Sequence, residues 1–160
     1  MVESTIQGLY EIAPVHAYFV PGNHDRDAVF SLGDSIEGRF ANIDDVIVEN
    51  QAIKRMYHQW GKDLLIGFDH GDRIREKNWS QVMMVDRPQQ YAEAARRYMR
   101  FGHYHKNQKK KILDYTIKDE HYGVDVEICP SLSPTDKWHF QNLYVGNIRR
   151  SKSFIYRFGS

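Results

Sequence analysis

Residues 16–25 have the sequence His-Ala-Tyr-Phe-Val-Pro-Gly-Asn-His-Asp, in which a short run of strand-forming side chains ends at a proline–glycine turn. A polar loop follows at once and carries an amide, an imidazole and a carboxylate. The same order, an apolar strand and then a histidine-bearing loop, recurs at residues 63–72 and 98–105. Because α/β folds place their sites just beyond strand ends, these three loops are candidates for one shared site.

The rest of the chain alternates helical and extended patterns. Helices are expected at residues 2–12, 27–40 and 79–97, with a weak point at Gly33 in the second and a break at Pro88 in the third. Two strands are expected at 46–48 and 53–60 around a turn, and later strands at 111–117, 124–129 and 153–158. The pattern predicts an α/β or α+β fold, a sheet layer covered by helices, in a single domain over residues 1–160.

Composition sets limits on the class of protein. With 160 residues, 41% hydrophobic content and a formal net charge of +1, the chain is expected to be a globular protein without a global attraction for nucleic acid. The single cysteine, Cys129, cannot form an intrachain disulfide, which favours the cytoplasm. Apolar runs are far shorter than the roughly 20 residues of a membrane span, so no membrane association is expected.

Four histidines lie in the three loops: His24, His70, His103 and His105. Imidazole beside Asn or Asp oxygen gives a mixed nitrogen and oxygen donor set, which suits Mn, Fe, Zn or Ni. In an extended segment His103 and His105 would point to the same side of the backbone. Any one of these histidines alone is more often an ordinary surface or core residue, but four in strand-end loops favour a metal site.

Three motifs then carry a resemblance: Gly22-Asn23-His24-Asp25, His70-Gly71-Asp72 and Gly102-His103-Tyr104-His105, in this order. They resemble the last three motifs of the calcineurin-like metallophosphoesterase superfamily. More loosely, residues 131–146 resemble the tail of phage-type members and DNA repair exonucleases. The resemblance implies an αββα sandwich with a two-metal centre, in which the ions lower the pKa of bound water for attack on phosphorus.

The resemblance also implies a role for each motif residue. Asn23, His70 and His103 would ligate one ion and His105 the other, with Mn²⁺ the expected metal. His24 would stabilise or protonate the leaving oxygen, and Asp25 would orient His24. Turn formation or helix capping is an equally strong explanation for Asp25 and for Asp72.

The family pattern begins with an Asp-x-His motif and a Gly-Asp-x-x-Asp motif, and this sequence starts after both. We therefore expect the C-terminal portion of a metallophosphoesterase domain, a partial sandwich without its first strands, holding one or two ions. The strand at 16–20 would then present an exposed edge. We expect a second copy, forming a homodimer, or a separate N-terminal fragment to cover that edge.

A basic run flanks the histidine pair: Arg96, Arg97, Arg100, Lys106, Lys109, Lys110 and Lys111. Arg100, Lys106 and Lys109 are the predicted substrate contacts, because clustered cations attract phosphate. A solvated helix and loop face explains the run about as well. The predicted function is a metal-dependent phosphodiesterase, a nuclease acting on DNA. The alternative is a catalytically inactive, truncated relative that binds nucleic acid or a protein.

Overall fold

The computed structural model describes residues 1–74, 78–102, 118–121, 123–129 and 151–157. Its contacts group the chain into two compact units, unit 1 (Met1–Met56) and unit 2 (Tyr57–Ser160). Each unit contains its own buried apolar cluster. None of the helices in these described ranges is both long and apolar enough to cross a membrane.

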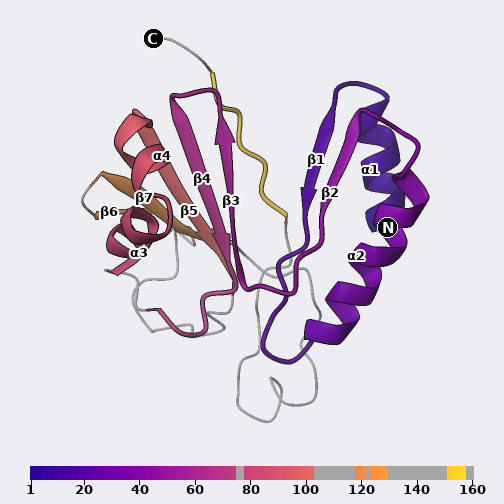
Figure 1. Cartoon of the computed structure of the whole chain (residues 1–160), viewed down its shortest axis with the longest axis horizontal. Coiled ribbons are helices and arrows are strands. Elements are labelled where there is room, and N and C mark those ends of the chain that lie inside the picture. Colours follow the sequence, from indigo (N-terminus) through magenta and orange to yellow (C-terminus); the bar gives the residue numbers. More distant parts are fainter. Residues whose placement is uncertain (75–77, 103–117, 122, 130–150, 158–160) are drawn as a thin grey trace. The chain divides into compact units, whose positions relative to one another are not determined.

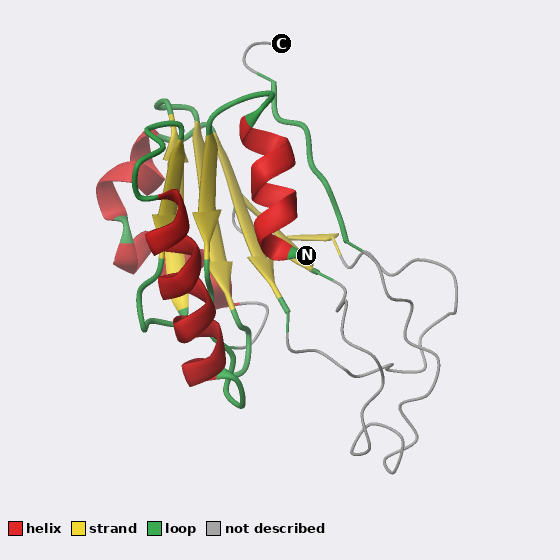
Figure 2. Ribbon diagram, turned by 90° about the vertical axis from the view of Figure 1, so that its right-hand side faces the viewer, coloured by secondary structure: helices red, strands yellow, loops and turns green. Residues whose placement is uncertain are grey.

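Unit 1 places two helices on one face of a two-stranded parallel sheet. Its elements are α1 (Val2–Tyr10), β1 (Val15–Tyr18), α2 (Arg26–Phe40) and β2 (Val46–Glu49). Figures 1 and 2 show both helices along the same side of the strands. The core is formed by Ile6 from α1, Ile36 and Phe40 from α2, and Val46 from β2, all at most 8% exposed. The four elements expected from the sequence in this region are confirmed, with ends shifted by at most two residues.

The register of β1 against β2 fixes the direction of the backbone groups of β1. Val15 pairs with Val46 and Tyr18 with Glu49, and the N–H groups of Val15 and Phe19 donate to Asp45 and Glu49 carbonyls at 2.7 and 3.0 Å. Alternate residues of a strand in parallel pairing direct their backbone groups to opposite sides. The backbone groups of His16 therefore point away from β2.

Gly33 is not the weak point that the sequence suggested, because α2 is continuous from Arg26 to Phe40. Gly33 is buried, and a Cβ atom there would overlap the side chain of Asn50, which follows β2. The amide of Asn50 donates to the carbonyl of Phe30 at 3.0 Å. The missing side chain thus lets the segment after β2 pack against the helix.

Unit 2 is built on a five-stranded mixed sheet. The strand order is β3 (Arg55–Trp60), β4 (Leu64–Asp69), β5 (Arg96–Phe101), β7 (Val124–Ile128) and β6 (Lys118–His121). β5 is parallel to both β4 and β7, and β6 is antiparallel to β7. Side chains from α3 (Trp79–Asp86) pack with alternate residues of β4, β5 and β7 in a core that includes Leu65, Trp79, Met83, Met99 and Val126. The expected combination of helices and sheets is confirmed.

One sequence expectation in this part of unit 2 needs correction. The helix expected at 79–97 ends early: α3 stops before Pro88, α4 runs from Pro88 to Glu93, and Arg96 and Arg97 belong to β5. The two strands expected around the turn near residue 50 are both present, as β2 and β3, and they lie in different sheets because β2 joins β1 and β3 joins β4. The strand β6 was not expected, and the strand expected at 111–117 lies outside the described residues.

Residues 151–157 form no strand, contrary to the expectation for 153–158, whose last residue lies outside the described ranges. Side-chain contacts hold this segment instead. Lys152 Nζ lies 2.5 Å from Glu127 Oε1 on β7, and Arg96 Nη2 on β5 donates to the Arg157 carbonyl at 2.6 Å. The guanidinium of Arg100 lies 4.4 Å from the ring centre of Phe154. The segment is yellow in Figure 1.

Candidate functional site

The first motif forms the loop between β1 and α2. Pro21 and Gly22 are buried, whereas Asn23 and His24 are exposed. The N–H of Gly22 donates to Asp25 Oδ1 at 2.7 Å, and α2 begins at the next residue. The carboxylate of Asp25 therefore closes the loop that carries Asn23 and His24. That Asp25 orients His24 stays a prediction. Its alternative role, forming the turn, is supported by the hydrogen bond from Gly22.

The second motif follows β4 and is closed in a similar way. Asp69, the last residue of the strand, is 8% exposed, and its Oδ1 accepts the Gly71 N–H at 2.6 Å. Gly71 has a φ of 92°, a conformation that favours glycine. A Cβ atom at this position would lie 2.7 Å from Phe101 Cδ2. His70 is half-buried between these two fixed residues.

The third motif begins beside the second. The parallel register pairs Asp69 with Phe101, so the two strands end together. A Cβ atom placed on Gly102 would lie 3.9 Å from the His70 carbonyl oxygen. The loops that start at residues 70 and 102 are therefore neighbours, as the strand-end argument predicts. His103 and His105 lie outside the described residues, so their proposed part in metal binding stays a prediction.

Arg100, one of the predicted substrate contacts, is buried. Its side chain is 7% exposed, and Nη1 lies 3.5 Å from Oε2 of Glu127, whose side chain is 2% exposed. The guanidinium also stacks over the ring of Tyr98 at 4.8 Å and donates to the Tyr156 hydroxyl at 3.2 Å. These contacts show that Arg100 is packed and paired with charge within unit 2, and its predicted contact with substrate stays a prediction. The other two predicted substrate contacts, Lys106 and Lys109, lie outside the described residues.

The donor chemistry of the predicted ligands fits a divalent metal. Asn23 offers an amide oxygen and His70 an imidazole nitrogen, a combination suited to Mn, Fe, Zn or Ni. Among the residues that the structure describes, no three His, Cys, Asp or Glu side chains form a metal-sized cluster. Asn23 belongs to unit 1 and His70 to unit 2.

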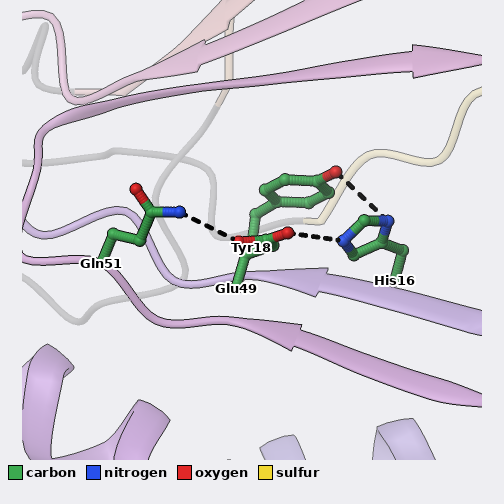
Figure 3. A network of polar contacts seen from close by, with 4 residues as sticks. All are labelled: His16, Tyr18, Glu49 and Gln51. Atoms are coloured by element: carbon green, nitrogen blue, oxygen red, sulfur yellow. Dashed lines mark hydrogen bonds and ion pairs between the residues drawn. The ribbon is translucent and has the colours of Figure 1, made fainter.

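A polar network on unit 1 was not anticipated from the sequence. His16 Nε2 lies 3.2 Å from Glu49 Oε1, the Tyr18 hydroxyl lies 3.3 Å from His16 Nδ1, and Gln51 donates to Glu49 Oε2 at 3.2 Å (Figure 3). The rings of His16 and Tyr18 stack at 4.5 Å. Burial and then the Glu49 carboxylate raise the pKa of Tyr18 to about 12. The two-residue spacing of His16 and Tyr18 was the available signal, because it puts both side chains on one strand face.

Comparison with known proteins identifies one family. The model of the calcineurin-like phosphoesterases matches residues 2–147, which contain all three motif loops. No curated protein and no solved structure matches the chain. Members of this family bind divalent metals and hydrolyse phosphoesters. On the extent of this match, together with the order of its motifs, the chain belongs to the calcineurin-like phosphoesterase family.

Proposed function

We propose that the protein is a manganese-dependent phosphodiesterase that acts on DNA. The observation that carries the proposal is the arrangement of the second and third motifs, which begin side by side after the parallel strands β4 and β5. The match to a phosphoesterase family supports hydrolysis of a phosphoester. Phosphodiester and DNA specificity rest on the basic run that flanks the third motif and on the looser resemblance to DNA repair exonucleases.

In this proposal some residues of the chain bind metal and another transfers a proton. Asn23, His70 and His103 would hold one ion and His105 would hold another. Bound ions would lower the pKa of water and so supply a nucleophile at neutral pH. As the water oxygen bonds to phosphorus, the opposite phosphorus–oxygen bond breaks, and the imidazolium of His24 gives its proton to the departing oxygen. The exposed position of His24 on a loop closed by Asp25 suits this contact with substrate.

Lys106 and Lys109 would attract the DNA backbone. Such contacts release counterions from DNA, so binding should weaken steeply as salt rises. Arg100 would contribute indirectly, because its guanidinium is bound to Glu127. Binding of single-stranded DNA that does not change between low and moderate salt would contradict this electrostatic recognition.

The decisive experiment measures hydrolysis of an activated phosphodiester and of single-stranded DNA, with and without Mn²⁺. We expect manganese-stimulated cleavage, and His24→Ala should lower kcat by about a hundredfold or more. His58→Ala is the matched control, because His58 lies in β3 and outside the motifs. Equal rates for the His24→Ala variant and the parent would contradict the catalytic assignment. DNA binding without any cleavage would favour an inactive binding module.

Strand β1 suggests how the protein assembles. In the described sheet of unit 1 it pairs with β2 along one edge. The other edge of a strand can recruit a further strand. The proposal therefore includes a homodimer, or a complex with a separate N-terminal fragment, joined at this edge. A monomeric mass in solution scattering, with no partner recovered by affinity capture, would contradict it.

A further inference from the structure

We infer that Asp69 is a positioning residue, which fixes the loop of His70 by holding the Gly71 amide, and that it is not itself a metal ligand. The inference deepens the proposed function, on which it rests, by adding a residue to the machinery of the site. Its basis is the short hydrogen bond of 2.6 Å between the Gly71 N–H and Asp69 Oδ1.

The location of Asp69 explains why its carboxylate turns to the backbone. Side chains alternate along β4, so Asp69 lies on the same face as Leu65, which belongs to the core under α3. Asp69 as a whole is only 8% exposed. A buried charge of this kind requires polar partners, and hydrogen bonds from backbone N–H groups to a carboxylate are among the strong ones.

The loop of His70 also packs against a buried aromatic ring. Gly71 lies so close to the ring of Phe101 that a Cβ atom would meet Cδ2 at 2.7 Å. Phe101 is 2% exposed and stacks on Trp79 at 5.4 Å, and Trp79 is fully buried. The Asp69 hydrogen bond thus holds the loop against a rigid aromatic pair. His70 lies between the two anchored residues, so its backbone position is set before any ion binds.

The observed contact of Asp69 is with its own loop. A coordinating carboxylate presents an oxygen to the ion, whereas Oδ1 of Asp69 accepts the Gly71 N–H. Residues that orient ligands commonly affect metal affinity by about 10- to 100-fold when they are removed. An acceptor oxygen of the same shape should therefore preserve the function of Asp69, even without its charge.

The test compares Asp69→Asn with Asp69→Ala, each measured by Mn²⁺ titration and by NMR of the metal-free protein. The asparagine retains an acceptor oxygen, so we expect affinity within about threefold of the parent, and a loss of about 10-fold or more for the alanine. In the metal-free protein, the Gly71 amide proton should lie downfield in the parent and in Asp69→Asn. It should move upfield in Asp69→Ala, together with a change in the His70 ring signals.

Asp63→Ala is the matched control, because this exposed carboxylate precedes the other end of β4. It should change neither reading. Equal, large losses of affinity in both Asp69 variants would identify a metal ligand and overturn the inference, as would unchanged Gly71 and His70 signals in Asp69→Ala. A parent protein that binds no Mn²⁺ would refute the proposed function, while the NMR comparison would still decide the role of Asp69.

Discussion

Tyr18 shows how a single side chain can set a response to pH. The pKa of its hydroxyl is raised from 10.0 to about 12 by burial and by the Glu49 carboxylate. The folded state therefore favours the protonated phenol, and the resulting stability is present below pH 10 and lost as the pH rises toward 12. We predict a steeper fall in the free energy of unfolding over this range for the parent than for Tyr18→Phe, measured by urea denaturation. Parallel curves for the two proteins would contradict the prediction.

At the same scale, sequence reasoning predicted residue types better than contacts. The loop positions of Asn23 and His70 follow from strand and turn signals, and the structure confirms these loops. Hydrogen bonds from Gly22 to Asp25 and from Gly71 to Asp69 could not be predicted, because they depend on the path of a few backbone atoms. Arg100 was predicted as a substrate contact from charge clustering alone, which carries no information on burial.

At the scale of elements, β5 and β7 are joined by charge as well as by hydrogen bonds. Glu127 on β7 meets Arg100 on β5 and Lys152 from the C-terminal segment, at 3.5 and 2.5 Å. We predict that Glu127→Gln lowers the free energy of unfolding by about 3 kcal/mol, because it leaves a buried guanidinium without its counter-charge. Urea denaturation provides the measurement.

Glu93→Gln is the control for this change. Glu93 is exposed on α4 and accepts a hydrogen bond from Gln89 at 3.2 Å, so its replacement should cost no more than about 0.5 kcal/mol. If both substitutions lowered the free energy of unfolding equally, the buried ion pair would not contribute to the stability of the sheet.

The largest difference between the expected and observed elements lies at residues 79–97, where one helix was expected. Its apolar spacing is helical as far as α4, but Ala94 adopts an extended backbone with a ψ of 124°. Arg96 and Arg97 then pair with Leu64 and Leu65 of β4. Helix propensity is a weak prior, and pairing with a distant strand overrode it here.

For the whole molecule, metal binding should appear as stability. A ligand that binds only the folded state at 100 times its Kd adds about 2.7 kcal/mol, which corresponds to roughly 5 to 10 °C in Tm for a chain of this size. We predict a rise of this order when Mn²⁺ is added, and its reversal by a chelator. Asn23→Ala and His70→Ala should each reduce the rise. An identical Tm with and without Mn²⁺ would contradict the prediction.

The mixed α/β class and the neighbouring second and third loops could be predicted from sequence, because both follow from strands that alternate with polar turns. The division into two units could not. The sequence near Met56 carries no signal of a boundary between two units. β2 and β3 belong to different sheets because β2 pairs with β1 and β3 pairs with β4. The single domain and the complete ligand set stay predictions.

The attachment of residues 151–157 has a consequence for synthesis on the ribosome. Glu127 is made 25 residues before Lys152, its partner in the ion pair. Until Lys152 and the residues after it have left the exit tunnel, the Glu127 carboxylate lacks Lys152 and the Arg100 guanidinium lacks Tyr156. Unit 1, which contains residues 1–56, has by then emerged completely. Nascent chains should therefore order unit 1 first and complete unit 2 only after residues 151–157 have emerged.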